Sequence, residues 1–178
     1  MSMFGNKGND GAAGGSWPLR FDSFSFGARA YNTLRAVVIF DNTHQLSENA
    51  ELSPTGEPYA PDWKDDWKAG HAITADRVFP PPAVVRWTSL DGVDHSSEID
   101  LEAIFPDRLI LHDAKEGEVV DGWAMERHAR HVSIFLEIND RTVNVYMRGW
   151  VALKQRRDPN DRKSDDLRDL MLAWTKTY

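Results

Sequence analysis

The sequence predicts an α+β fold, in which a mainly antiparallel sheet of about six or seven strands, built from successive hairpins, carries a C-terminal amphipathic helix. Three observations support this prediction: a proline-led hairpin over residues 79–101, two alternating strands over residues 131–153, and a stripe of large apolar residues after Ser164. At 178 residues the chain is long enough to bury one sizeable core.

The chain is expected to form a single domain over residues 17–178, preceded by a flexible tail. Residues 1–16 are rich in Gly, Ala and Asn and offer too little apolar surface to offset the entropy lost on ordering. Strands are predicted within residues 17–30, where apolar residues mostly alternate, and within residues 31–41, which contain a continuous apolar run. Residues 42–76 have few aliphatic side chains and several turn formers, which indicates an insertion or binding loop.

The central hairpin, residues 79–101, has the sequence FPPPAVVRWTSLDGVDHSSEIDL. Its first strand is β-branched and aromatic, and Asp91-Gly92 supplies the positive φ angles that a two-residue type I′ turn requires. Such a turn would pair Val84 with Ile99 and would direct Trp87 to the opposite face. A slip of one residue would exchange the two faces, so the existence of the hairpin is a stronger prediction than its register.

A second strand pair is predicted over residues 131–138 and 142–153, joined by the turn residues 139–141. The first of these strands alternates cleanly, and the second alternates as far as Gly149, which indicates a bulge or a close backbone approach. The apolar residues expected on one face of the pair are Val132, Ile134, Leu136, Ile138, Val143, Val145 and Met147.

An amphipathic helix is predicted after the polar loop of residues 154–163. Ser164 is a favourable N-cap, and Asp165 and Asp166 would complement the helix dipole in the first turn. The apolar residues that follow recur at helical spacing and would face the sheet. They are Leu167, Leu170, Met171, Trp174 and Tyr178.

Composition and charge limit the classes of function. Hydrophobic residues make up 41% and charged residues 28% of the chain, as in a soluble globular protein. The net charge of −7 disfavours nucleic acid and favours a basic macromolecule as partner. The absence of cysteine excludes disulfides and thiol chemistry. Because the N-terminus does not resemble a secretory signal and the longest apolar run covers only residues 36–40, we expect a cytoplasmic protein without membrane contact.

The predicted partner-binding residues fall in two acidic segments. The first lies within residues 61–71, where two tryptophans four residues apart are flanked by acids: Asp62, Trp63, Asp65, Asp66 and Trp67. Tryptophan is enriched at binding hot spots, but both indoles could equally cover an edge of the core. The second segment follows the central turn and contributes Asp94, Glu98 and Asp100.

The sequence contains no reaction motif, so neither catalytic residues nor a cofactor is predicted. Asp94, His95 and Ser96 are the residue types of a nucleophilic triad, but neighbours on a strand point to opposite faces. His128 and His131 lie near Glu126 without a third-ligand pattern, so no metal site is predicted. Two alternatives to a binding protein remain: a hydrolase that uses carboxylates or histidines, and a structural or carbohydrate-binding β module, which the seven tryptophans would serve.

Two stretches, FPPPAVVRWTSLDG and VSIFLEINDRTVNVYMRG, resemble the small bacterial immunity proteins encoded beside type VI secretion effectors. SWPLRFDSFSFGARAYN and LMLAWTKTY resemble uncharacterised proteobacterial proteins of the same kind. The resemblance implies a non-enzymatic protein that binds one cognate effector toxin and occludes its active site. Many such relatives are periplasmic lipoproteins, whereas this chain has no cysteine to carry a lipid. This departure favours a toxin that acts in the cytoplasm, with a nuclease as the candidate because a basic cleft suits an acidic inhibitor.

Overall fold

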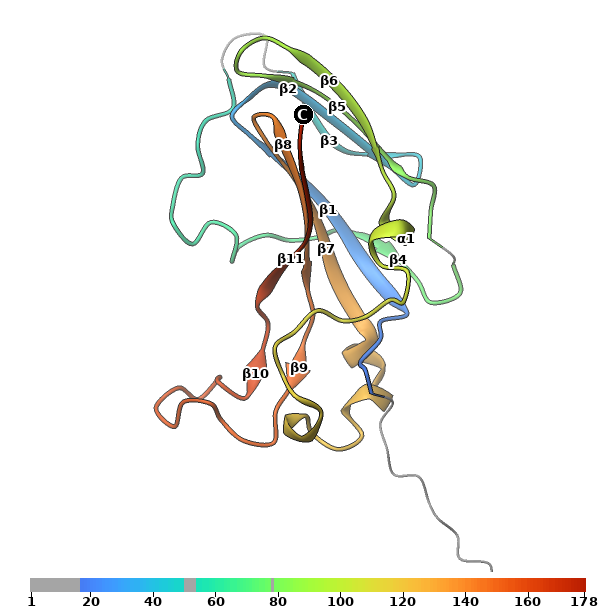
Figure 1. Cartoon of the computed structure of the whole chain (residues 1–178), viewed down its shortest axis with the longest axis vertical. Helices are drawn as coiled ribbons and strands as arrows, with labels where there is room; N and C mark the ends of the chain where they lie inside the picture. The colour runs from blue at the N-terminus through green and yellow to red at the C-terminus, as the bar shows by residue number, and fades with distance from the viewer. Residues whose placement is uncertain (1–16, 50–53, 78) are drawn as a thin grey trace, which may run out of the picture.

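Two β-sheets pack face to face around one hydrophobic core (Figure 1). The computed structural model describes residues 17–49, 54–77 and 79–178, so the predicted tail over residues 1–16 lies outside the described residues. The first sheet has the strand order β11-β8-β7-β1-β4 and the second has the order β3-β2-β5-β6, while β9 and β10 form a short separate pair.

The five-stranded sheet consists of β1 (Ser23–Tyr31), β4 (His71–Ile73), β7 (His131–Asn139), β8 (Thr142–Arg148) and β11 (Leu170–Thr177). The four-stranded sheet consists of β2 (Thr33–Phe40), β3 (Thr43–Asn49), β5 (Ala83–Ser89) and β6 (Asp94–Ile99). The short pair is β9 (Val151–Ala152) and β10 (Asp166–Leu167). The segment predicted as an insertion, residues 42–76, therefore includes two strands, β3 and β4.

The helices in the described part of the chain are single turns: α1 (Leu101–Ile104), η1 (Glu116–Glu118), η2 (Trp123–Met125) and η3 (Arg127–Arg130). Because the described chain is mostly β and its helices do not form a layer, the predicted α+β class is wrong. Within the described ranges, no helix has the length and apolarity needed to cross a membrane.

Strand β1 connects the two sheets. It runs parallel to β7 along its whole length, a pairing that a fold built from successive hairpins does not include. Its side chains Phe24 and Phe26 point into the core, where their rings lie 6.2 and 4.3 Å from the ring of Phe40 on β2. Asn32, with a φ of 53°, then turns the chain from β1 into β2, so one sharp bend carries it from one sheet to the other.

The predicted central hairpin forms between β5 and β6, but its register differs from the expected one by one residue. Val84 pairs with Glu98 and not with Ile99, so the two faces are exchanged. Trp87 consequently shares the buried face with Ile99, and each is only 2% exposed. The predicted register is therefore wrong.

The turn length explains this difference in register. Ser89 donates from its backbone N–H to the carbonyl of Val93 at 3.0 Å, which closes a loop of three residues in place of two. Gly92 has a φ of 81°, whereas Asp91 does not have the positive φ that a type I′ turn would require. A three-residue loop with glycine in the left-handed conformation adds one residue and shifts every pair along the hairpin.

The predicted C-terminal helix is wrong, because the segment forms strand β11 at the edge of the five-stranded sheet. Met171 pairs with Met147, but beyond a register shift Trp174 pairs with Val145. The shift inserts an extra residue, so the side chains that face the core are three residues apart at this point. This spacing imitates the period of a helix, and for that reason the apolar stripe was compatible with both structures.

The predicted strand pair is confirmed as β7 and β8, with Asn139 opposite Thr142. The expected apolar face is buried in the common core. The expected close approach at Gly149 is also present, because a Cβ on this residue would lie 2.5 Å from the Cγ2 of Ile110.

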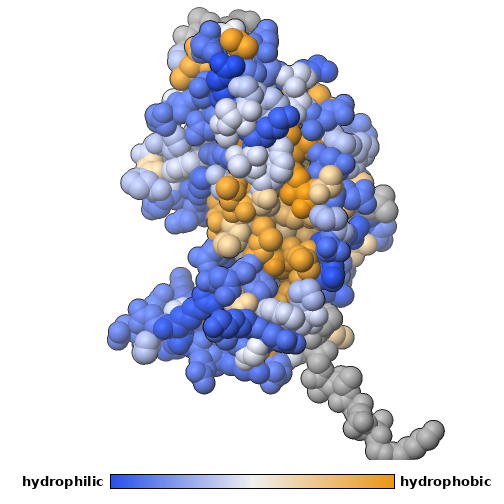
Figure 2. All heavy atoms as spheres, in the orientation of Figure 1, coloured by the Kyte–Doolittle hydropathy of each residue, from blue (hydrophilic) through white to orange (hydrophobic). Residues whose placement is uncertain are grey.

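Hydrophobic residues gather at the middle of the face drawn in Figure 2, over β11 and beside α1. Ile104, Leu111 and Trp174 are partly buried hydrophobic residues that pack against the core. Because the C-terminal segment is a strand and not a covering helix, part of the core lies near the surface along β11.

Gly149→Ala should lower the free energy of unfolding by about 1–3 kcal/mol, the usual cost of overpacking a core. The added methyl would meet the branched side chain of Ile110, which is buried and has little room to move. The matched control is Gly117→Ala, where a Cβ would find no atom within 4 Å. Urea unfolding of both variants measures the difference, and equal stabilities would contradict the close approach at Gly149.

Candidate functional site

The first predicted partner segment lies on the outer face of the five-stranded sheet. Trp67 is only 5% exposed, and its ring centroid lies 5.5 Å from that of Phe135 and 5.8 Å from that of Tyr146. Trp63 is half-buried between Trp67 and Tyr31, at ring distances of 4.9 and 4.5 Å. The two indoles thus form a small second core outside the sheet.

Strand residues hold the backbone of this segment close to the sheet. A Cβ at Gly27 would lie 3.1 Å from the Cα of Ala69, so the absence of a side chain lets the segment approach β1. Arg148 on β8 donates to the carbonyl of Lys64 at 2.7 Å and to the carbonyl of Trp67 at 3.3 Å. One guanidinium therefore satisfies carbonyl groups that a regular strand or helix would otherwise pair.

A buried carboxylate lies beneath the segment. Glu137 is 2% exposed and accepts hydrogen bonds from the Asn144 amide at 2.9 Å and from the Tyr146 hydroxyl at 3.0 Å. The Lys64 ammonium donates to the same hydroxyl at 2.6 Å and lies 3.9 Å from the carboxylate. Burial, and then the charge of Glu137, raise the pKa of Tyr146, so the phenol keeps the proton that it donates.

The acids of the segment face solvent. Asp62, Asp65 and Asp66 are exposed, in contrast to the tryptophans between and beside them. Tyr59 joins them, with 79% of its surface exposed and its hydroxyl donating to Asp66 at 3.3 Å. The Asp66 carboxylate is the main cause of the raised pKa of Tyr59. Sequence reasoning missed this tyrosine, although an aromatic residue in a polar loop was the available signal.

The second predicted segment belongs to the other sheet. Asp94 and Glu98 are exposed on the outward face of β6, and the Asp94 carboxylate accepts from the Thr88 hydroxyl at 2.6 Å. Asp100 is the N-cap of α1, where its carboxylate accepts from the backbone N–H of Ala103 at 3.1 Å. The two acidic segments therefore lie on outer faces of opposite sheets, and the structure does not bring them together.

The triad residue types on β6 are also separated. His95 points inward and stacks on Trp87 at a centroid distance of 4.8 Å, while Asp94 and Ser96 face outward. The structure therefore agrees with the strand argument that neighbouring residues cannot form a relay.

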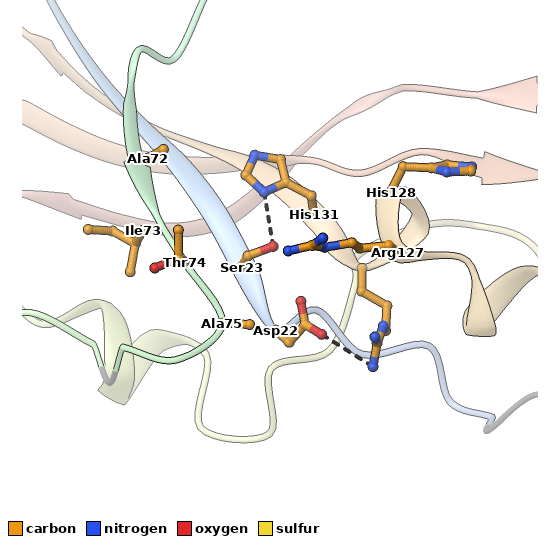
Figure 3. A pocket seen from close by; sticks show the side chains of 10 residues that line it. Asp22, Ser23, Ala72, Ile73, Thr74, Ala75, Arg127, His128 and His131 are labelled. Carbon is orange, nitrogen blue, oxygen red and sulfur yellow. Dashed lines mark hydrogen bonds and ion pairs between the residues drawn. The ribbon is translucent and has the colours of Figure 1, made fainter.

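A hollow of about 660 Å³ opens at the end of the five-stranded sheet where β1 and β7 begin (Figure 3). Ser23 of β1, Asp22 just before this strand and His131 of β7 line it from the sheet. Residues 72–75, in β4 and the turn after it, form one side, and residues of η3 close the other side. We call it the β1–β7 hollow. It includes none of the predicted partner-binding residues.

His131 is the central side chain of the β1–β7 hollow. Its Nδ1 lies 3.0 Å from the Ser23 hydroxyl, and its Nε2 lies 3.0 Å from the Ser25 hydroxyl. The residue as a whole is exposed, yet partial burial of its imidazole lowers the pKa, against the opposing effect of Asp22. The Asp22 carboxylate itself pairs with Arg130 at 3.2 Å. No sequence pattern indicated this cluster, because its strands are paired across more than a hundred residues.

His128 does not join His131 as a metal ligand. Its ring points away from His131 in Figure 3 and stacks on Trp150 at a centroid distance of 4.8 Å. Among the residues that the structure describes, there is no group of three His, Asp or Glu side chains that could hold a metal ion.

Comparisons of this chain with protein-family models, with curated proteins and with solved structures found no match.

Trp67→Ala should lower the free energy of unfolding by about 3–5 kcal/mol, the usual range for loss of a buried large aromatic side chain. The indole fills the space between Phe135 and Tyr146 and would leave a cavity there. Tyr59→Ala is the control in the same segment and should change stability little, because the tyrosine is exposed. Thermal or urea unfolding compares the two, and a small effect of Trp67→Ala would mean that the segment is not anchored.

The lowered pKa values of His112 and His131 should make the fold less stable at mildly acidic pH, since burial is the main cause of both shifts. The unfolded chain binds these protons at higher pH than the folded chain. The stability contributed by the neutral imidazoles is therefore fully present above the ordinary histidine pKa of about 6.5 and is lost as the pH drops below it. Urea unfolding at about pH 7.5 and pH 5.5 measures this loss.

Two variants isolate the contribution of His131. His131→Asn should reduce the loss of stability on acidification, whereas His44→Asn, at an exposed histidine on β3, should leave that loss as in the parent protein. If both variants show the parent pH dependence, burial of His131 has no energetic consequence.

Proposed function

We propose that this protein is an immunity protein that binds and neutralises a cognate type VI secretion effector by occluding its active site. The proposal includes a cytoplasmic location and a cytoplasm-acting toxin, with a nuclease as the candidate. It is supported by the resemblance of the sequence stretches described above and by the net charge of −7, which suits a basic substrate cleft.

The observation that carries the proposal is the anchored acidic segment on the five-stranded sheet. Trp67 and Arg148 fix its backbone, while Asp62, Asp65 and Asp66 remain exposed. A segment that is already ordered loses little conformational entropy on binding, so more of the contact energy is available for affinity. Such an acidic surface is suited to the lysines and arginines of a toxin.

Within this proposal the tryptophans and the tyrosine have different tasks. Trp63 and Trp67 hold the segment in place, and Tyr59 supplies the exposed aromatic contact beside the acids. A desolvated aromatic contact governs mainly the dissociation rate, whereas the acids govern mainly the association rate at low salt.

Binding should be tested with the product of the neighbouring effector gene, by co-purification and then by surface plasmon resonance. Tyr59→Ala should raise the dissociation rate by about tenfold or more, the effect of losing roughly 1.4 kcal/mol or more at a hot spot. Asp65→Lys with Asp66→Lys should slow association, and the effect should diminish as salt is added.

The control for these charge reversals is Asp94→Lys with Glu98→Lys on the opposite sheet, which should leave association nearly unchanged. If only this second pair slows association, the toxin binds the β6 face and the proposed surface is wrong. If no adjacent effector forms a complex and none is neutralised, the proposed function itself fails.

A further inference from the structure

The β1–β7 hollow is lined by more basic than acidic side chains, although the chain as a whole is acidic. The chain carries a net charge of −7, yet the charged side chains that line this hollow are two arginines, Arg127 and Arg130, and one acid, Asp22. Asp22 forms its ion pair with Arg130. Among the described residues, no carboxylate lies within ion-pair distance of Arg127, so its charge is not neutralised by a neighbour.

Arg127 is directed toward Ser23 and His131. In Figure 3 its side chain extends from η3 toward Ser23 and His131, whereas the second arginine bends toward Asp22. A guanidinium offers several N–H donors in a fixed plane, and it binds phosphate oxygens in pairs. Hydroxyl donors beside it would reach further oxygens of the same group.

The two serine bonds of His131 determine how many hydroxyl protons are free. A neutral imidazole donates from one nitrogen and accepts at the other, so Ser23 or Ser25 must give its proton to the ring. An imidazolium donates from both nitrogens, so both hydroxyls then accept from the ring and keep their own protons for another acceptor. Protonation of His131 therefore adds a charge and a donor together.

The other groups around the ring do not already supply this effect. The serines come from β1 and Asp22 immediately precedes it, while Arg127, His128 and Arg130 come from η3. Residues 72–75, in β4 and the turn after it, carry no titratable side chain. The paired Asp22 favours the imidazolium and burial of the ring opposes it, so an anion placed beside Arg127 would shift the balance toward the protonated ring.

We propose that the β1–β7 hollow binds a phosphate group, as free phosphate or as a small phosphomonoester, through Arg127 and the Ser23 hydroxyl, with His131 taking up a proton on binding. The hollow is larger than a phosphate needs, and the small side chains of Ala72 in β4 and Ala75 after it leave room for the rest of an ester. This site does not depend on the proposed immunity function, because its lining includes none of the predicted partner-binding residues.

The first test titrates the purified protein with inorganic phosphate and with phenyl phosphate, and follows the imidazole signals of His131 by NMR. Both ligands should shift these signals. Tighter binding of phenyl phosphate would identify an ester as the ligand, and equal binding would identify the free anion. Absence of any shift at His131 with either ligand would overturn the proposal.

The second test compares arginine variants by isothermal titration calorimetry. Arg127→Gln should weaken phosphate binding by about tenfold or more, as expected for one lost charge-assisted hydrogen bond. Arg162→Gln is the matched control, since Arg162 is exposed in the loop after β9 and forms no ion pair with the described residues. Equal losses in both variants would mean unspecific attraction of anions and would overturn the site.

The proton uptake is tested with inorganic sulfate, whose charge does not change over this range. Sulfate should bind more tightly at about pH 5.5 than at about pH 7.5, because the imidazolium is the binding form. His131→Gln should abolish this pH dependence, and its thermal unfolding shows whether the fold is retained. A pH dependence that survives in a folded His131→Gln variant would exclude His131 as the proton acceptor.

Discussion

The parallel register of β1 on β7 is the constraint on which the rest of this structure depends. With Phe24 opposite Val132 and Phe26 opposite Ile134, alternate residues of both strands enter the core between the sheets. The residues between them must then face outward. Because the side-chain period of a strand is two, a shift of one residue would move the phenylalanines to the surface and the outward groups into the core.

Both candidate surfaces are built on the outward side of β1. Gly27 lets the anchored segment lie against the strand. Ser25 and Ser23, two and four residues before Gly27, hold the imidazole of His131. The surfaces differ in charge, since the segment displays acids to solvent and the β1–β7 hollow is lined by arginines. Under the two proposals, one sheet face would bind a basic protein at one end and an anion at the other.

The acidic segment lies over a buried carboxylate, Glu137 of β7. Desolvation of Glu137 is costly, and it is offset by hydrogen bonds from Asn144 and Tyr146 together with the nearby ammonium of Lys64. A network of this kind stabilises only the arrangement in which every partner is in place. Through Lys64 it adds directional contacts to the segment, which the packing of two indoles does not supply.

The sequence by itself determined the local patterns: the alternation of β7 and β8, the hairpin around Gly92, the small residue required at Gly149 and the acidic charge. These properties depend on period, turn chemistry and composition, which are written in neighbouring residues. The C-terminal stripe around Trp174 was ambiguous, because a bulged strand and a helix produce the same spacing. Only the tertiary structure decided that it is a strand, since pairing with β8 supplies the backbone hydrogen bonds that an isolated helix would have made itself. The same is true of both surfaces, whose contacts join residues far apart in the chain. Ser23 meets His131 through the pairing of β1 with β7, and Trp67 meets Phe135 because the segment packs on the outer face of the sheet, and no local pattern records either contact.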